Sequence, residues 1–120
     1  MSHVVTIPTK LHDPAAVAAA CQRLGLAAPV QGTAQLYSGE ATGLLVQLPG
    51  WQYPVAVDTL TGAVRYDNYG GAWGEQQHLD HFLQMYAVEK TKLEARRRGY
   101  SVSEQALQDG SIKVQVIEGS

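Results

Sequence analysis

The segment from Glu75 to Arg98 constrains the fold of this chain more than any other stretch. Its apolar residues recur at the spacing of one helical face, at Leu79, Phe82, Leu83, Tyr86 and Leu93. Three arginines close the segment and Gly99 follows, as expected at the C-terminus of a helix. A helix of about 23 residues is about 35 Å long, so it would extend across a whole domain of this size.

A second, shorter helix is predicted near the N-terminus. Asp13 can accept hydrogen bonds from the free N–H groups of the first turn, Pro14 suits that turn, and Gly25 suits the position after the last turn. The apolar stripe of this helix, which should lie on a sheet, consists of Val17, Cys21 and Leu24. We interpret Cys21 as a buried structural thiol, because no histidine or basic residue adjoins it in the sequence.

The remaining segments have the pattern of short strands. A β-branched run opens the chain at 3–7, a meander of antiparallel strands fills 33–67, and two alternating segments flank an Asp109-Gly110 turn typical of hairpins. We predict the order β-α-β-β-β-α-β-β, which contains the βαββαβ pattern of ferredoxin-like folds with an extra strand in the middle and one at the end. The expected fold is a single α+β domain, 1–120. Its antiparallel sheet should carry both helices on one face and have its first strand near the centre.

The charge and cysteine content exclude several classes of protein. The 120 residues carry a formal net charge of -2 and one cysteine. An acidic balance is unlike that of a general nucleic-acid binder, and a lone cysteine excludes an internal disulfide. The N-terminus lacks the pattern of a signal peptide, and no apolar run approaches the roughly 20 residues that span a bilayer. These features predict a cytoplasmic protein that does not enter a membrane.

Three stretches of the chain resemble one known family: MSHVVTIPTK at the start, QGTAQLYSG in the middle, and YAVEKTKLEARRRGYSVSEQALQDGSIKVQV at the end. The family is the conserved hypothetical chloroplast reading frame thirty-five, which also occurs in cyanobacteria and other bacteria and is classed as a domain of unknown function. The most specific pieces are Ser2-His3, Tyr86-Ala87 and the turn from Asp109 to Ile112, whereas 51–73 departs from the pattern. The resemblance implies a small α+β domain and no particular reaction. Members are often encoded near an AAA-type ATPase, which implies an accessory role beside such a partner.

The stretch RYDNYGGAWGEQQHLDHF, from Arg65 to Phe82, contains aromatic residues, glycines and histidines close together in the sequence. Gly70 and Gly71 permit a sharp turn, and Trp73 is of a residue type that often anchors an interface. An exposed aromatic patch that binds a partner would consist of Trp51, Tyr66, Tyr69 and Trp73. The same sequence also fits a loop that folds back so that Trp73 plugs the core, and both interpretations stay open.

Two histidines are the best candidates for metal or proton chemistry. His78 and His81 lie three residues apart, so they would share one helical face. A metal site needs further ligands, for which the sequence offers Glu75, Asp67, Asp80 or His3. No motif of known catalysis or cofactor binding is present, so we expect a non-enzymatic protein without a cofactor. A metal protein or small enzyme that uses the two histidines with a carboxylate is the alternative.

The basic end of the long helix suggests a second alternative. Arg96, Arg97 and Arg98 could contact phosphates of RNA, while Tyr37, Tyr53 and Tyr66, expected on strands, could stack on bases. The signature of an RNA-binding sheet is missing, however. We prefer a solvated helix end in which Arg98 pairs with Glu94 one turn earlier.

The function predicted from the sequence is that of a small non-enzymatic binding or accessory domain. It would act through a protein partner, such as the ATPase that the resemblance implies, or through self-association. The contact would use the aromatic stretch, the uncovered sheet face, or edge strands such as 53–57 and 112–117.

Overall fold

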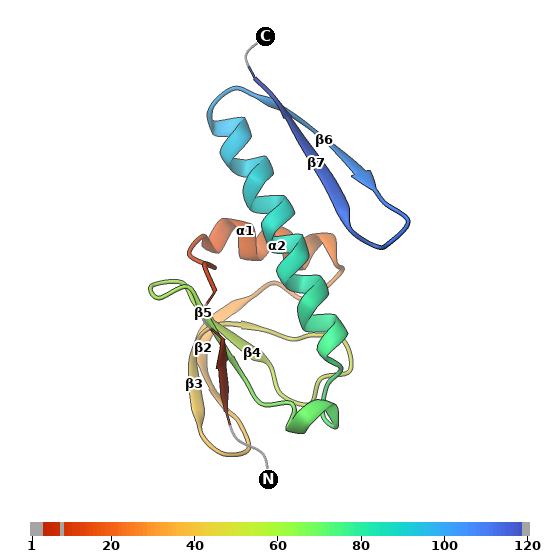
Figure 1. Cartoon of the computed structure of the whole chain (residues 1–120). Coiled ribbons are helices and arrows are strands. Elements are labelled where there is room, and N and C mark those ends of the chain that lie inside the picture. The colour runs from red at the N-terminus through yellow and green to blue at the C-terminus, as the bar shows by residue number, and fades with distance from the viewer. Residues whose placement is uncertain (1–3, 8, 119–120) are drawn as a thin grey trace.

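The computed structural model describes residues 4–7 and 9–118 of the chain. Its elements are, in order, β1 (Val5–Ile7), α1 (Pro14–Arg23), β2 (Val30–Gln35), β3 (Glu40–Val46), β4 (Val55–Asp58), β5 (Ala63–Tyr66), the short 3-10 helix η1 (Tyr69–Gly71), α2 (Gln76–Arg97), β6 (Ser101–Ala106) and β7 (Ile112–Ile117). Five strands form one antiparallel sheet in the order β1-β5-β4-β3-β2, and β6 and β7 form a separate hairpin (Figure 1). The predicted α+β class is therefore confirmed, and the arrangement is compatible with a ferredoxin-like type of sandwich.

Three details of the predicted topology are wrong. The helices are separated by four strands rather than three, β1 lies at an edge of the sheet rather than near its centre, and the segment 53–57 leads into β4, an interior strand. The physical reason is connectivity. Strands joined by short turns pair with their neighbours in the chain, so β2 to β5 form a meander whose two edges are β2 and β5. β1 pairs with the outer edge of β5 and thereby becomes an edge strand itself.

The last two strands lie away from the sheet because α2 carries the chain away from it. A helix of 22 residues rises about 33 Å, and β6 begins at its far end (Figure 1). The strands pair across the predicted turn, where the carboxylate of Asp109 accepts a hydrogen bond from the N–H of Ser111 at 3.0 Å. The predicted hairpin is therefore present, but within the described residues it pairs with no strand of the sheet.

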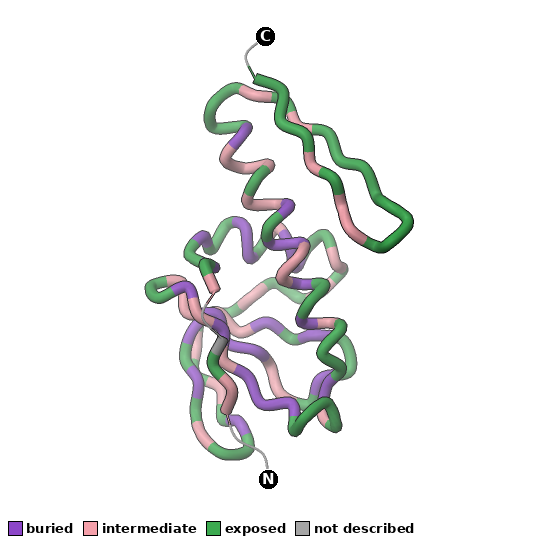
Figure 2. The backbone as a smooth tube through the Cα atoms, viewed as in Figure 1, coloured by how far each residue is buried: buried purple, intermediate pink, exposed green. Residues whose placement is uncertain are grey.

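Both helices pack on one face of the sheet and form the main core. Fully buried side chains come from α1, from α2 and from the strands, namely Val17, Cys21, Leu79, Phe82, Val46, Val55, Val57 and Val64. Figure 2 shows these buried segments between the sheet and the first half of α2, while the hairpin is mostly exposed. Cys21 is buried as predicted, and burial raises the pKa of its thiol, which disfavours the reactive thiolate.

The ends of both helices follow the predicted capping pattern. The Asp13 carboxylate accepts hydrogen bonds from the backbone N–H groups of Ala15 at 2.9 Å and Ala16 at 3.4 Å. Gly25 and Gly99 follow the two helices with φ of 71° and 76°, a conformation that favours glycine. These caps therefore define both ends of α1 and the C-terminal end of α2, whereas Glu75 at the start of α2 makes no side-chain capping bond.

A cluster of charged side chains attaches the hairpin to the helices. Glu104 of β6 accepts hydrogen bonds from both terminal nitrogens of Arg23, at 2.8 and 2.6 Å, and pairs with Lys92 at 3.0 Å. Glu89 pairs with the same two cations at 3.4 and 3.1 Å. The hydrogen bonds from Arg23 and Lys92 lower the pKa of Glu104 to about 2. One carboxylate thus connects α1, α2 and the hairpin.

No helix of the described chain is long and apolar enough to cross a bilayer.

We predict that the hairpin loosens when Glu104 loses its charge. The pKa of this carboxylate is lower in the folded protein than its ordinary value of 4.5, so its contribution to stability is complete above pH 4.5 and disappears as the pH falls toward 2. At neutral pH, Glu104→Gln should lower the hydrogen-exchange protection of the β6 amides about fivefold, equivalent to about 1 kcal/mol. The wild type should approach the variant as the pH falls toward 2.

Glu40→Gln is the matched control, because Glu40 is an exposed glutamate at the start of β3. It should leave the β6 amides unchanged. Equal protection of wild type and Glu104→Gln at neutral pH would show that the ion pairs do not hold the hairpin.

Candidate partner-binding site

The four aromatic residues predicted to form one patch divide into two groups. Trp51 and Tyr66 are core residues, with exposed fractions of 4% and 7%. Their rings meet edge to face with centroids 5.6 Å apart, and the indole N–H of Trp51 donates to the carbonyl of Glu75 at 3.0 Å. Placing these two residues in an exposed patch was therefore wrong, because the β3–β4 loop brings Trp51 under the start of α2. Trp51, rather than Trp73, is the residue that plugs the core.

Trp73 is instead the centre of a second aromatic cluster at the surface. Its ring stacks on Tyr69 with centroids 4.7 Å apart, and it meets Tyr37 and Tyr53 at 5.2 and 5.7 Å in tilted and edge-on contacts. Tyr37 and Tyr69 remain 66% and 45% exposed, while Trp73 and Tyr53 are partly buried. We call these four residues, Tyr37, Tyr53, Tyr69 and Trp73, the aromatic patch.

Three loops at one end of the sheet supply the aromatic patch. Tyr37 lies in the β2–β3 turn, and Tyr53 lies just before β4. Tyr69 begins η1 and Trp73 follows it, after β5. Tyr53 also packs on a small apolar cluster on the sheet face opposite the helices, formed by Leu36, Ala41 and Ala56. The patch therefore adjoins the face of the sheet that the helices leave uncovered.

Hydrogen bonds fix the loop that carries Trp73. Its backbone N–H donates to the carbonyl of Asn68 at 2.9 Å, and its carbonyl accepts from the N–H of Gln52 at 2.8 Å. The buried side chain of Asn68 donates to the carbonyl of Gly74 at 3.1 Å. Gly74 has no room for a side chain, because a Cβ there would overlap the ring of Trp51. The surface patch is thus fixed in position by the core tryptophan.

The backbone of η1 adopts the sharp turn that its glycines permit. Tyr69 has a φ of 48°, and Gly70 and Gly71 follow at 61° and 104°. A positive φ is unfavourable for a tyrosine, and here it turns the ring back over Trp73. Asp67, which is 1% exposed, accepts hydrogen bonds from the N–H of Tyr69 at 3.3 Å and the hydroxyl of Ser38 at 3.4 Å. These contacts connect the η1 loop to the β2–β3 turn that bears Tyr37.

The segment of the chain that contains the aromatic patch has more acidic than basic residues. Residues 33–81 contain one basic side chain, Arg65, and five acidic ones, Glu40, Asp58, Asp67, Glu75 and Asp80. The basic residues Lys90, Lys92, Arg96, Arg97 and Arg98 lie on the second half of α2. Residues 33–81 therefore carry a net charge of -4, whereas residues 82–118 are close to neutral at +1.

His78 and His81 lie in the first two turns of α2, where His78 is partly buried and His81 is exposed. His78 lines a surface hollow with Glu75 and glycine-rich backbone at 49–50 and 71–74. Within the described residues, no group of three or more His, Cys, Asp or Glu side chains is placed to hold a metal ion. His3, one of the suggested ligands, lies outside the described residues. The metal site stays a prediction that this geometry does not support.

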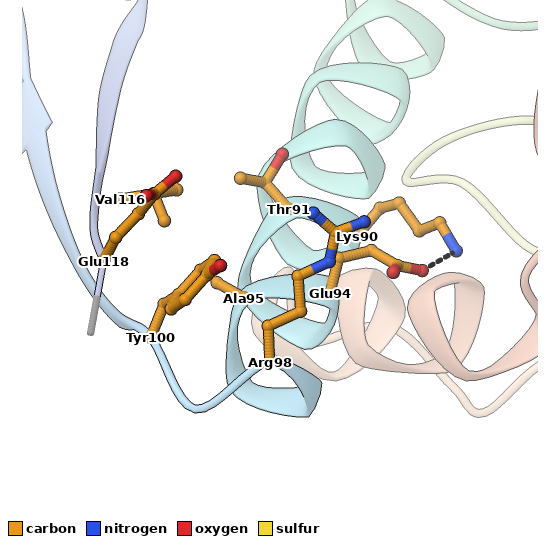
Figure 3. Close-up of a pocket in the computed structure, with 8 residues that line it drawn as sticks. All are labelled: Lys90, Thr91, Glu94, Ala95, Arg98, Tyr100, Val116 and Glu118. Atoms are coloured by element: carbon orange, nitrogen blue, oxygen red, sulfur yellow. Dashed lines mark hydrogen bonds and ion pairs between the residues drawn. The ribbon is translucent and has the colours of Figure 1, made fainter.

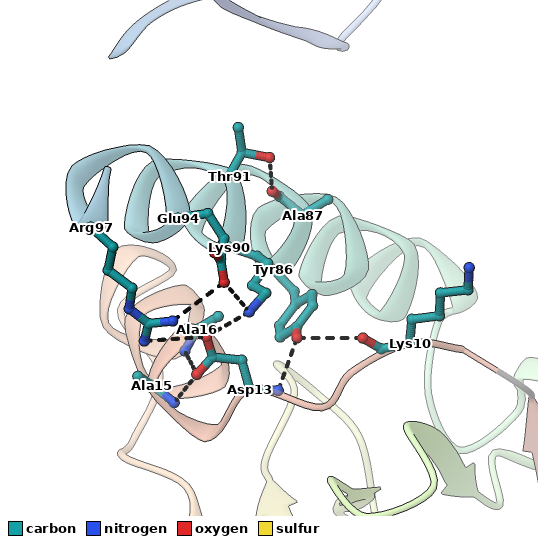
Figure 4. A network of polar contacts seen from close by, with 10 residues as sticks. All are labelled: Lys10, Asp13, Ala15, Ala16, Tyr86, Ala87, Lys90, Thr91, Glu94 and Arg97. Atoms are coloured by element: carbon teal, nitrogen blue, oxygen red, sulfur yellow. Dashed lines mark hydrogen bonds and ion pairs between the residues drawn. The ribbon is translucent and has the colours of Figure 1, made fainter. Parts of the chain in front are cut away.

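The basic end of α2 is partly engaged within the protein: Arg97 makes ion pairs, whereas Arg96 and Arg98 make none among the described residues. Arg97 approaches Glu94 at 3.3 Å and Asp13 at 3.9 Å, and Lys90 pairs with the same two carboxylates (Figure 4). Burial raises the pKa of Asp13, but the Lys90 hydrogen bond and the capping N–H groups lower it more. The ion pair expected between Glu94 and Arg98 is absent among the described residues. Arg98 instead lines a hollow below the hairpin (Figure 3).

Sequence reasoning missed Tyr37 and Tyr53 as members of the aromatic patch, because it placed both on strands. Each one adjoins a turn residue, in the Tyr37-Ser38-Gly39 and Tyr53-Pro54 sequences. Such neighbours are typical of loops rather than strands, so this signal could have placed the two tyrosines at loop positions. Their contact with Trp73 depends on the strand register and was not visible in the sequence.

Comparison of the chain with protein-family models, curated proteins and solved structures gives no match. The resemblance to the chloroplast reading-frame family therefore stays a prediction.

Replacing each tryptophan in turn should show which one belongs to the core and which one to the surface. Trp51→Ala should lower the free energy of unfolding by about 3–5 kcal/mol, because it leaves a large cavity in the core. Trp73→Ala should cost only about 1 kcal/mol, since its neighbours are other surface rings. Chemical denaturation followed by far-UV circular dichroism measures both values. A loss for Trp73→Ala as large as that for Trp51→Ala would show that Trp73 is a core residue.

Proposed function

We propose that this protein is a non-enzymatic binding domain that recognises a protein partner through the aromatic patch. The observation that carries the proposal is the position of Trp73, which is held at the surface among three tyrosines by a hydrogen-bonded loop. Aromatic side chains that are partly exposed and already ordered lose little entropy when they are covered. They therefore make efficient anchors in a protein interface.

The buried core beneath the patch supports this function. The loop that carries Trp73 packs against the ring of Trp51 at Gly74. It is also hydrogen-bonded to the β3–β4 loop through the backbone N–H of Gln52. A partner would therefore meet a preformed surface, and preorganisation raises affinity because fewer groups become ordered on binding. Tyrosine hydroxyls add hydrogen-bonding capacity at the rim of such a surface.

The charge of the segment that bears the patch favours one kind of partner. With acidic residues prevailing over 33–81, a partner segment that carries arginine or lysine together with apolar side chains matches best. An arginine can stack on the exposed face of Tyr37 or Tyr69 as a cation–π contact, which is worth about 0.5–2 kcal/mol. The proposed partner is therefore a protein with an exposed basic and apolar segment.

An AAA-type ATPase is the first partner to examine, because the family resemblance implies an accessory role beside such an enzyme. A role in catalysis or RNA binding has less support. Within the described residues the histidines lack a third ligand, and the cations Lys90, Lys92 and Arg97 are paired with carboxylates.

Photochemical cross-linking tests whether a partner binds at the aromatic patch. A photoreactive phenylalanine analogue in place of Tyr37 should cross-link one defined protein in the cells that make this chain, and the site of attachment on that protein should be a basic segment. With that protein purified, Trp73→Ala should raise the Kd at least tenfold, as expected for an aromatic hot spot. Isothermal titration calorimetry measures the Kd.

Leu60→Ala is the matched control, because Leu60 is 92% exposed in the β4–β5 turn, outside the aromatic patch. It should leave the Kd unchanged. Binding should also weaken as salt is raised, since the proposed contact includes opposite charges. Equal affinity of wild type and Trp73→Ala would exclude the patch as the binding site.

A further inference from the structure

The hairpin at the other end of the molecule has an unpaired edge. β6 and β7 pair only with each other within the described residues, and the hairpin is mostly exposed (Figure 2). On β7, Val116 and Ile117 are 40% and 48% exposed. A strand edge offers unpaired N–H and C=O groups to another chain, and natural edges are usually protected by charge, proline or a bulge. From Ile112 to Ile117, β7 contains one charged residue, Lys113, and no proline.

The strand register shows which backbone groups face outward. The N–H of Leu107 donates to the carbonyl of Ser111 at 2.9 Å, directly beside the first strand pair, Ala106 with Ile112. Hydrogen-bonded and non-hydrogen-bonded pairs alternate along an antiparallel ladder. Ile112 is therefore in a non-bonded pair, and Lys113 is hydrogen-bonded to β6 through its backbone. The backbone N–H and C=O groups of Ile112, Val114 and Val116 point away from β6.

The sequence of β7 is compatible with its own antiparallel copy. A two-fold axis perpendicular to the hairpin at Val114 would place Ile112 opposite Val116 of a second copy, and Lys113 opposite Gln115 of that copy. All outward backbone groups then find partners, apolar side chains meet on one face, and no like charges face each other. This self-complementarity points to a second copy of the chain rather than to an unrelated strand.

A hollow lies where the second copy would approach. It has a volume of about 460 Å³ and lies between α2 and the end of β7, with Thr91, Ala95 and Val116 in its wall (Figure 3). Charged side chains complete the wall, namely Lys90, Glu94, Arg98 and Glu118. The hollow is thus partly apolar and partly charged, and both signs of charge are present.

The spacing of two joined hairpins suits a pair of neighbouring helices. Neighbouring strands are about 4.8 Å apart, so two hairpins joined edge to edge have centres about 10 Å apart. Packed helices have axes about 8–10 Å apart. The α2 helix of the second copy would therefore lie beside this one, and the small side chains Ala87 and Thr91 permit close approach.

We propose that two copies of this protein associate through β7. The two hairpins form a continuous four-stranded antiparallel sheet about a two-fold axis at Val114, and the paired α2 helices fill the hollow beneath it. The surface lies near the C-terminus of the chain, at the end of the molecule opposite the aromatic patch (Figure 1). The inference goes beyond the proposed partner binding and does not depend on it.

Sedimentation equilibrium of the full chain, from about 5 to about 500 µM, tests the association at concentrations where small interfaces assemble. The wild type should shift from 13.0 kDa to twice that mass. Val114→Pro should raise the dimer Kd at least tenfold, because proline removes an outward N–H without removing a β6–β7 bond. Wild type that stays monomeric throughout, or a dimer unaffected by Val114→Pro, would overturn the proposal.

A pair of substitutions tests the register without disturbing the hairpin. Gln115 is exposed and would face Lys113 of the second copy. Gln115→Lys should raise the dimer Kd about fivefold, and Gln115→Glu should lower it by a similar factor. Equal effects of the two substitutions would contradict this register. Trp73→Ala should leave the dimer unchanged, so loss of partner binding and loss of self-association are separately measurable.

Discussion

The packing of α2 on the sheet is the contact on which the rest of the structure depends. Leu79 and Phe82 are completely buried between the sheet and α1, and the hydroxyl of Tyr86 accepts a hydrogen bond from the N–H of Asp13 at 3.1 Å. The first half of α2 thus closes the main core and orients the start of α1. The second half extends past the sheet and carries the hairpin. Without this helix, only α1 would cover this face of the sheet, and the hairpin would lose the element that carries it.

The same helix separates the two surfaces proposed for binding. At its start, the carbonyl of Glu75 bonds Trp51, and Trp51 supports the loop that presents Trp73. At its end, Lys92 and Glu89 hold Glu104 and Arg23, which fix the hairpin. Apolar burial holds the first end. The second is held by ion pairs of partly exposed groups, by the packing of Ile112 on the core and by a hydrogen bond from Gln84 to the carbonyl of Gly110. Ion pairs of this kind are sensitive to pH and salt, so the attachment of the hairpin should depend more on solution conditions than the core does.

The two surfaces also differ in chemistry. The aromatic patch offers rings on a rigid segment of acidic net charge, which favours a basic and apolar segment of another protein. The β7 edge offers backbone groups and alternating valines, which favour a strand. A dimer formed through the hairpins would place two aromatic patches at its far ends. One dimer would then carry two binding sites for the partner. Bivalent binding is stronger than binding at one site when both sites can be reached at once.

The sequence by itself determined the local structure of this protein. Asp13, Pro14 and Gly25 defined α1, the apolar spacing from Leu79 defined α2, and Asp109-Gly110 defined the hairpin turn, because capping and turn formation depend on neighbouring residues. Only the tertiary structure decided which strands became edges and which aromatic residues met. Trp51 and Trp73 look alike in sequence, yet one is buried and the other lies at the surface with Tyr37 and Tyr53. Such contacts join residues far apart in the chain, so they are set by strand register and by the direction of α2, which no local pattern encodes.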